Sequence, residues 1–361
     1  MSVRPRVTEE RCAAAPANFG AFQVFATSPQ SLGSRPDTYL RNVIEVAQWS
    51  ESAGCTGTLV YTDNSIVDPW LVAQAILANT RTLVPLVAVQ PLYLHPYAAA
   101  KMVASLAYLY GRRVILNMVA GGFKNDLLSL GDQTPHDRRY DRLVEYVKVI
   151  QLLLRSALPV NYEGEFYRLT NAVLKPELPA GLEPEFFISG SSEAGFAAAR
   201  ATGAVAIKYP EPPEKTQAAA ASAANAHSGL RVGIIARELA EEAWQIAYER
   251  FPFDRKGQIA HEMAMRVSDS SWHKRLSALS KEACPAGTYW LGPFEVSKSN
   301  CPYLVGTYSD VAQDLRQYMQ LGYRTFILDI PPSAEELVHI RTVFEQASGF
   351  VSGLEGCEVQ A

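Results

Sequence analysis

Short apolar segments recur along the chain, and longer amphipathic stretches separate most of them. Each apolar segment is a nearly continuous run of Val, Ile, Leu, Phe and Ala, which is typical of a parallel strand buried on both faces. Eight segments are therefore predicted as strands, at residues 22–27, 57–61, 83–89, 113–119, 184–189, 204–208, 230–236 and 325–330.

The stretches between these strands carry apolar residues at helical spacing. Helices are predicted at residues 38–54, 69–78, 96–110, 138–154, 194–202, 240–249 and 310–321. Alternation of strands and helices indicates parallel strands joined by crossover helices. Eight strands favour an α/β fold of the closed (β/α)8 TIM-barrel type, and an open doubly wound sheet is the alternative. The 361 residues suit one barrel domain with insertions.

Two long segments interrupt the alternation of strands and helices. Residues 159–184 are rich in Pro and predict an excursion outside the barrel. Residues 251–307 contain an amphipathic stretch near 258–279, followed by a loop rich in Gly, Pro and Ser. Long insertions of this kind are often functional. We expect residues 251–307 to form a lid over the C-terminal mouth of the barrel, where active sites lie in this fold. Residues 1–20 are expected to be an N-terminal extension.

Composition narrows the class of protein. The net charge is −4 and no basic block stands out, so a nucleic-acid partner is not expected. No apolar run approaches the ~20 residues of a membrane span, and no secretory leader is evident, so we expect no membrane association. Five scattered cysteines without a CxxC pair favour reduced thiols in the cytoplasm. The six histidines form no HxH or HExxH arrangement, so no metal site is predicted.

The clearest candidate for a ligand site is Gly190-Ser191-Ser192, which follows a predicted strand and precedes a predicted helix. Backbone N–H groups at a helix N-terminus attract anions, and Gly190 allows a ligand to approach the backbone closely. A phosphate cradle is one interpretation, and an ordinary serine cap is the other. The segment has neither the Gly-Lys-Ser/Thr ending of a Walker A loop nor the spacing of a nucleophile elbow.

Two further polar segments begin at strand or helix ends. Asn117 lies near the end of the fourth predicted strand and is followed by small residues. Its amide could face a flat ring, or the segment could be a strand end that turns through two glycines. His136 and Tyr140 flank the start of the long helix predicted from residue 138, where a purely structural role is equally compatible with the sequence. No GxGxxG motif follows the first strand, so a dinucleotide of the Rossmann kind is not indicated.

Taken in order, these segments resemble the luciferase-like flavin monooxygenases, above all alkanesulfonate and long-chain alkane monooxygenases. The resemblance covers about residues 22–344. It is carried by residues 54–60, 68–73, 117–122, 136–140, 162–167, 190–194 and 237–244.

This resemblance implies that reduced FMN binds at the C-terminal mouth of the barrel and reacts there with O2. Tyr140, Ser191 and Ser192 match the positions of phosphate ligands in the family. Gln90, Asn117 and His136 match positions that line the isoalloxazine ring. The family generally receives reduced FMN from a separate flavin reductase, and its members are often dimers or tetramers. A homodimer or homotetramer is therefore expected.

The substrate half of the sequence departs from the alkanesulfonate pattern. Four polar positions of a sulfonate site are replaced or altered, at Ile66, Gly233, Ser297 and Pro331. An arginine that recognises an anion with two donors is not easily replaced. We therefore expect hydroxylation or oxidative cleavage of a small organic substrate other than a sulfonate.

Two residues are candidates for the catalytic chemistry. Arg231 is retained from the family pattern and could hold a substrate anion or stabilise an oxygenated flavin, or form a structural ion pair. His95 lies near the end of the third strand and could carry a proton, or support a turn with Pro96.

Three other functions remain open at this stage. A dehydrogenase of the same fold could use F420 or FMN without O2. A flavin-binding protein could have lost catalysis. A hydrolase barrel would need paired carboxylates at strand ends, where Asp63 and Asp329 lie, but the surrounding motifs argue against it.

Overall fold

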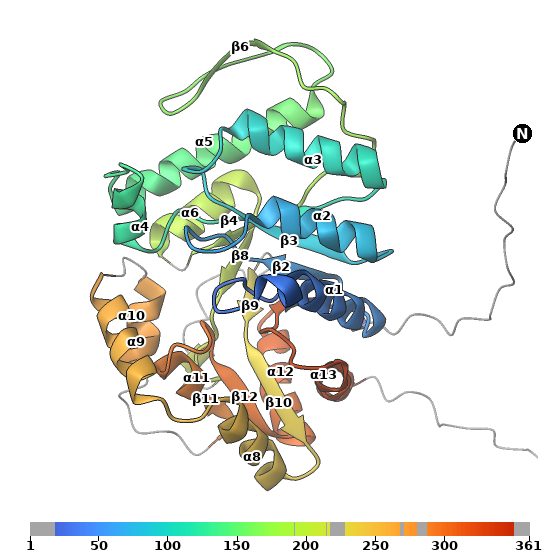
Figure 1. Cartoon of the computed structure of the whole chain (residues 1–361), viewed down its shortest axis with the longest axis vertical. Coiled ribbons are helices and arrows are strands. Elements are labelled where there is room, and N and C mark those ends of the chain that lie inside the picture. Colours follow the sequence, from blue (N-terminus) through green and yellow to red (C-terminus); the bar gives the residue numbers. More distant parts are fainter. Residues whose placement is uncertain are drawn as a thin grey trace, which may run out of the picture.

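A closed barrel of eight parallel strands forms the centre of the computed structural model (Figure 1). The structure describes residues 19–190, 192–213, 215–216, 228–267, 271–279 and 287–349. The barrel strands, in their order around the barrel, are β1 (Gln23–Thr27), β2 (Gly57–Val60), β3 (Val84–Val89), β4 (Ile115–Met118), β7 (Phe186–Ser189), β8 (Val205–Lys208), β9 (Ser228–Arg231) and β13 (Thr325–Ile327). The predicted (β/α)8 fold is confirmed, and the open sheet is wrong because β13 pairs with β1 and closes the barrel.

Helices surround the barrel and bury their apolar stripes against it. Neighbouring helices pack in the order α13, α1, α2, α3, α5, α6. Their bounds are α1 (Pro36–Ser52), α2 (Pro69–Asn79), α3 (Pro96–Tyr110), α5 (His136–Arg155), α6 (Glu193–Thr202), α12 (Tyr308–Gln320) and α13 (Ala334–Ser348). None of the described helices is long and apolar enough to cross a membrane.

The barrel interior is filled with side chains rather than open. Seven strands each contribute one buried apolar side chain to a single cluster: Phe25, Leu59, Leu86, Ile115, Phe187, Ile207 and Ile327. The eighth strand contributes Gly229, where a Cβ atom would lie 2.7 Å from Ile207 and 2.9 Å from Thr325. The packed interior closes the barrel below its mouth, so a ligand has room only at the C-terminal ends of the strands.

The seventh predicted strand, residues 230–236, proves to be two strands. β9 ends at Arg231, and β10 (Gly233–Arg237) pairs with β12 (Tyr303–Thr307) instead of with the barrel. β12 also pairs with β11 (Tyr289–Trp290), which completes a three-stranded sheet beside the barrel. The prediction of one strand was wrong because a change of pairing partner leaves the apolar run unbroken.

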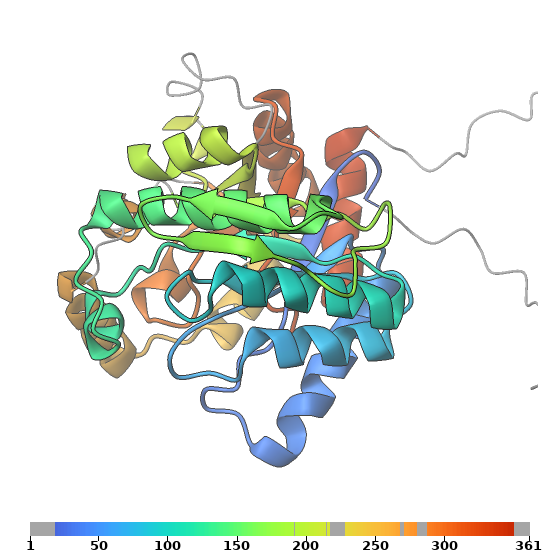
Figure 2. The same cartoon turned by 90° about the horizontal axis from the view of Figure 1, so that it is seen from above.

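Both predicted insertions have structure of their own. Residues 159–184 contain the antiparallel hairpin of β5 (Val160–Glu163) and β6 (Arg168–Ala172), which lies over α5 and α3 (Figure 2). Residues 251–307 contain α9 (Arg255–Val267), α10 (Ser271–Leu279), β11, α11 (Gly292–Glu295) and β12. The loop expected after residue 279 is thus partly a sheet. The short helix α4 (Lys124–Ser129) follows β4, and α8 (Ala240–Arg250) packs against β10 and β12 of the second sheet.

Candidate functional site

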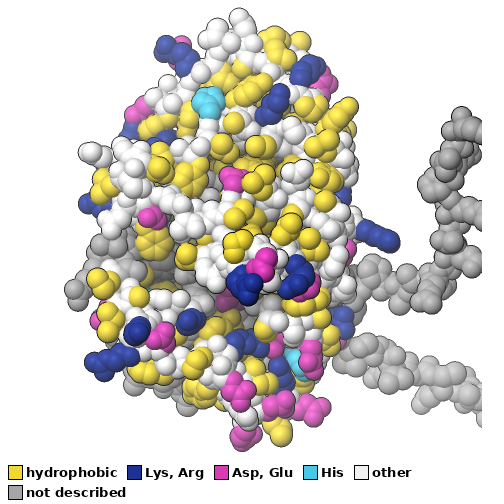
Figure 3. Space-filling view, in the orientation of Figure 1, with side chains coloured by type: hydrophobic (Ala, Val, Ile, Leu, Met, Phe, Trp, Pro, Cys, Tyr) yellow, Lys and Arg dark blue, Asp and Glu magenta, His cyan; other side chains and the backbone are white. Residues whose placement is uncertain are grey.

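A cavity of about 330 Å³ opens at the C-terminal ends of the barrel strands, and we call it the mouth cavity. Figure 3 shows the surface hollowed on the side where α4 and α9 lie. Residues at the strand ends or just beyond them form its inner wall: Leu59, Tyr61, Ala88, Gln90, Asn117, Val119, Ser189, Tyr209 and Arg231. The outer wall comes from the loop after β2, from residues 121–127, and from Asn300 of the 251–307 insertion. The insertion therefore reaches the predicted site.

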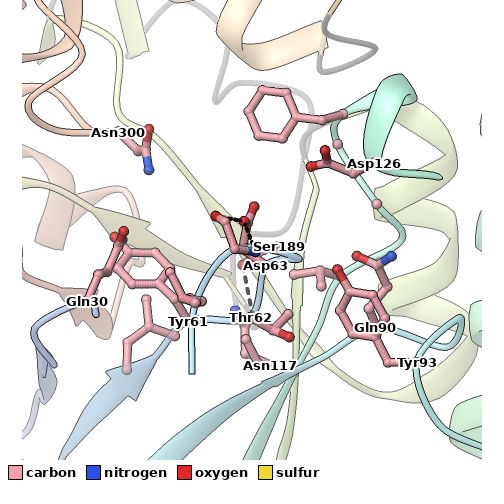
Figure 4. Close-up of a pocket in the computed structure, with 18 of the residues that line it drawn as sticks. Gln30, Tyr61, Thr62, Asp63, Gln90, Tyr93, Asn117, Asp126, Ser189 and Asn300 are labelled. Atoms are coloured by element: carbon pink, nitrogen blue, oxygen red, sulfur yellow. Dashed lines mark hydrogen bonds between the residues drawn. The ribbon is translucent and has the colours of Figure 1, made fainter. Parts of the chain in front are cut away.

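Two amide side chains lie in the inner wall. Asn117 accepts a hydrogen bond from the Ser189 hydroxyl at 2.8 Å, which joins the ends of β4 and β7 (Figure 4). Gln90 is 8% exposed, and its side chain also lines the cavity. Amides almost always find partners when buried. These two groups therefore offer donors and acceptors to a polar ligand in the mouth cavity.

Arg231 brings a buried positive charge to the same wall. Its side chain is largely covered, with 6% of the residue exposed. The guanidinium carbon lies 4.8 Å from the centre of the Tyr61 ring and 5.8 Å from that of Tyr209. Nε and Nη2 are buried and have no hydrogen-bond partner among the described residues. A buried cation with unfilled donors is unfavourable unless an anionic or polar group meets it. The arrangement favours such a group in the ligand.

The turn between β7 and α6 holds the predicted phosphate cradle. Ser192 caps α6 by accepting a hydrogen bond from the Gly195 amide at 3.1 Å. Burial raises the pKa of Tyr140, and a side-chain hydrogen bond with Ser192 opposes that rise. A Cβ atom on Gly190 would lie 2.3 Å from the Tyr140 hydroxyl. Tyr140, Gly190 and Ser192 thus meet at one helix N-terminus, beside Ser189 of the mouth cavity. Ser191 lies outside the described residues.

The two predicted histidines lie outside the wall of the mouth cavity. His136 is the first residue of α5, with Nδ1 2.7 Å from the Asp137 carboxylate and its ring edge-on to Tyr140 at 5.3 Å. His95 caps α3 by accepting a hydrogen bond from the Tyr97 amide at 3.2 Å. The structure therefore gives His95 a capping contact rather than a place at the cavity. The His136 ring contacts Tyr140 of the predicted phosphate cradle. It does not line the wall that Gln90 and Asn117 form.

Sequence analysis missed several residues of the cavity walls. Tyr93, Asp126, Tyr209 and Asn300 line the cavity, and nothing in their local patterns marks them. Asp63 was considered only as half of a hydrolase pair with Asp329. Asp329 does not line the cavity. Its carboxylate accepts hydrogen bonds from Ser299 and Tyr303. The carboxylate pair that a hydrolase would need is therefore not formed by Asp63 and Asp329.

Comparison with known proteins decides the family. The profile of luciferase-like monooxygenases matches residues 20–325. The chain belongs to the luciferase-like monooxygenase family. A relative in Niallia circulans, the 4-(gamma-L-glutamylamino)butanoyl-[BtrI acyl-carrier protein] monooxygenase BtrO, is 37% identical over 321 residues. That alignment covers 86% of this chain and 92% of the relative.

Solved structures of other enzymes share the fold. Long-chain alkane monooxygenase LadA matches with a TM-score of 0.69 at 18% identity, covering 92% of this chain and 93% of that one. An F420-dependent secondary alcohol dehydrogenase matches with a TM-score of 0.61 at 17% identity, covering 90% and 97%. At such identities the likeness establishes the fold and leaves the choice between flavin and deazaflavin chemistry to other evidence.

Three of the four positions that depart from the alkanesulfonate pattern can be located in the structure. A Cβ atom on Gly233 would lie 2.4 Å from the ring of Tyr303, so that ring fills the place of a histidine side chain. Ile66 lines the mouth cavity and adds an apolar surface to it. Ser297 is exposed and has a positive φ of 56°.

Proposed function

We propose that this protein is a two-component monooxygenase that uses reduced FMN and O2 to hydroxylate or oxidatively cleave a small organic substrate other than a sulfonate. The observation that carries the proposal is the set of polar groups at the barrel mouth. Arg231 has two buried donors without partners among the described residues, and the Gln90 amide lines the same cavity. Both are suited to a bound group that carries several polar atoms on a flat ring.

The residues present fit FMN. At one end, Tyr140, Gly190 and Ser192 meet at the N-terminus of α6, where backbone N–H groups and the helix dipole favour a phosphate. Ser191 continues this turn in the sequence and is proposed as a further ligand. At the other end, Gln90 and Asn117 would face the ring, and His136 would support Tyr140 through their ring contact. When bound, reduced FMN would supply the electrons that activate O2.

Arg231 is proposed to act on the reacting groups. A guanidinium that is desolvated and held over Tyr61 interacts more strongly with a developing negative charge than an exposed one does. It would bind a substrate anion or the negative charge that develops on oxygen. Asn300 and its neighbours in the 251–307 insertion would exclude water from the mouth cavity when substrate is bound. His95 is left out of this chemistry because it does not line the cavity.

For the substrate, we propose an acyl group attached to a carrier protein. BtrO, which is named for an acyl-carrier-protein substrate, matches this chain over most of both sequences. The mouth cavity is open to solvent on the side of α4 and α9, and an acyl group on a flexible arm could enter there. We further propose a separate flavin reductase as partner, a homodimer or homotetramer, and a cytoplasmic location.

The test is an anaerobic titration with reduced FMN followed by rapid mixing with O2. The wild type should bind reduced FMN and show a transient oxygenated flavin in its absorbance. Tyr140→Phe should bind reduced FMN about ten-fold more weakly, because it loses a hydrogen bond to a charged group. Tyr97→Phe is the matched control, since the Tyr97 hydroxyl donates to Val173 outside the cavity and should leave the affinity unchanged.

Two results would redirect the proposal. Binding of reduced FMN without an oxygenated species would favour the dehydrogenase or the flavin-binding protein without catalysis. F420 binding in place of FMN would identify the deazaflavin alternative, whose fold the alcohol dehydrogenase shares. Absence of flavin binding would disprove the assignment of the α6 N-terminus and of the mouth cavity together.

A further inference from the structure

Two carboxylates line the outer wall of the mouth cavity. Asp63 lies just beyond β2, and Asp126 lies in the first turn of α4. Figure 4 shows both carboxyl groups facing the same hollow. Neither has an ion-pair partner among the described residues. Among the described residues, only Ser65 of the same loop donates hydrogen bonds to the Asp63 carboxylate, and none donates to the Asp126 carboxylate.

The negative charges of the two carboxylates act on each other. Burial raises the pKa of Asp126, and the negative charge of Asp63 raises it further. The Asn64 side chain donates to the Asp126 carbonyl at 3.2 Å and to the Ser129 hydroxyl at 3.3 Å, which fixes the β2 loop against α4. Like charges fixed at one wall repel each other unless a cation lies between them.

A second observation points to a charged ligand in this cavity. On the inner wall, Arg231 is 94% buried, and two of its nitrogens have no partner among the described residues. Tyr61 connects the two walls: its ring lies under the guanidinium, and the loop that it begins carries Asp63. The cavity therefore presents an unpaired positive group at its base and an unpaired negative pair at its rim. A ligand that neutralises both must carry a cation as well as a polar or anionic group.

We propose that Asp63 and Asp126 form a subsite for a primary ammonium group of the substrate. This inference rests on the proposed function and adds a substrate class to it, namely acyl groups that carry a free amine. A carboxylate pair recognises an ammonium through up to three donated hydrogen bonds. A neutral acyl chain would leave the pair unneutralised, so the pair selects for the amine by attraction and against its neutral analogue.

The test uses two probes that differ only in charge. A γ-linked glutamyl group keeps its α-amine free, so the probes are 4-(γ-L-glutamylamino)butanoyl-pantetheine and its Nα-acetyl derivative. Binding is measured by calorimetry, and turnover by mass spectrometry with reduced FMN and O2. We expect the wild type to prefer the free amine by about ten-fold or more in affinity and in kcat/KM. In Asp63→Asn and in Asp126→Asn this ratio should fall toward one.

Asp37→Asn is the matched control, because Asp37 is exposed at the start of α1 and pairs with Arg35. It should keep the wild-type ratio. The inference is overturned if the wild type shows no preference, if neither probe binds, or if both cavity variants keep the preference. It is also overturned if these variants lose affinity for reduced FMN, since the pair would then serve the flavin. A wild type that prefers the amine without binding flavin would disprove the proposed function and leave the subsite standing.

Discussion

Two buried arginines, six residues apart, show how neighbouring strands use the same side chain differently. Arg231 at the end of β9 has two buried nitrogens without partners among the described residues. Arg237 at the end of β10 donates to both oxygens of the Glu336 carboxylate, at 3.2 and 3.0 Å. Both residues are less than a tenth exposed. The first is placed to meet a ligand, and the second joins two elements of the fold.

Replacement of each arginine by methionine should separate these roles. Arg231→Met removes a desolvated charge and keeps apolar contact with Tyr61 and Tyr209. We expect its free energy of unfolding to stay within about 1 kcal/mol of wild type or to rise. Its kcat/KM should fall by about 100-fold or more. Arg237→Met is the control and should cost about 3 kcal/mol of stability, because it removes a partner of buried Glu336.

Urea unfolding and steady-state kinetics measure the two quantities on the same samples. A large loss of stability in Arg231→Met, with activity lost in proportion, would show that Arg231 serves the fold.

At the scale of one element, the glycines at the two ends of α6 have different structural roles. Gly190 precedes the helix and allows the Tyr140 hydroxyl to lie where a Cβ atom would be. Gly203 follows the helix with a φ of +69°, and nothing lies within 4 Å of its Cβ position. The N-terminal end is therefore shaped by a neighbouring side chain, and the C-terminal end by its own backbone.

Alanine substitutions at these glycines should act on different properties. Gly190→Ala should displace Tyr140 and weaken reduced FMN binding about five-fold or more, since overpacking costs about 1–3 kcal/mol. Gly203→Ala should lower stability by about 1 kcal/mol through backbone strain and leave the FMN affinity unchanged. Equal FMN affinities for Gly190→Ala and wild type, in an anaerobic titration, would contradict the cradle.

For the whole molecule, buried ion pairs fasten the second sheet to the barrel. The Glu336 carboxylate on α13 binds Arg237 of β10 and Arg250 at the end of α8. Burial favours a raised pKa for Glu336. Hydrogen bonds from Arg237 and the charges of Arg250 and Arg237 outweigh burial and hold that pKa below its ordinary value. The pKa of Asp132 is also below its ordinary value. Burial favours a raised pKa, but hydrogen bonds from Arg142 and Thr134 and the charge of Arg142 outweigh burial.

These lowered pKa values predict an acid-sensitive fold. A carboxylate whose pKa is lower in the folded state binds fewer protons than in the unfolded state, so it stabilises the protein at neutral pH. That contribution should be complete above about pH 5 and decline as the pH falls through the unfolded values, near 4, toward the folded ones. Urea unfolding between pH 7 and pH 3 measures it. Glu336→Gln should be less stable at pH 7 and should lose less stability on acidification than the wild type does. An unchanged pH dependence in Glu336→Gln would contradict this assignment.

The sequence by itself determined the barrel, because parallel strands buried on both faces leave an apolar run that needs no knowledge of their partners. It also marked the β7–α6 turn, since Gly190 and Ser192 are local signals of a helix start near a ligand. Gln90, Asn117 and Arg231 followed from resemblance to a family, and the structure places all three at one cavity.

Only the tertiary structure decided which polar residues share that cavity and which strands share a sheet. Asp63 and Asp126 meet because closure of the barrel brings the loops after β2 and β4 to the same rim, and neither residue has a local pattern that reports this. The run at residues 230–236 changes partner at Val232 without any change in its apolar character. Hydrogen-bond pairing and convergence of charges depend on contacts between distant segments, and a pattern along the chain records burial but not the identity of the neighbour.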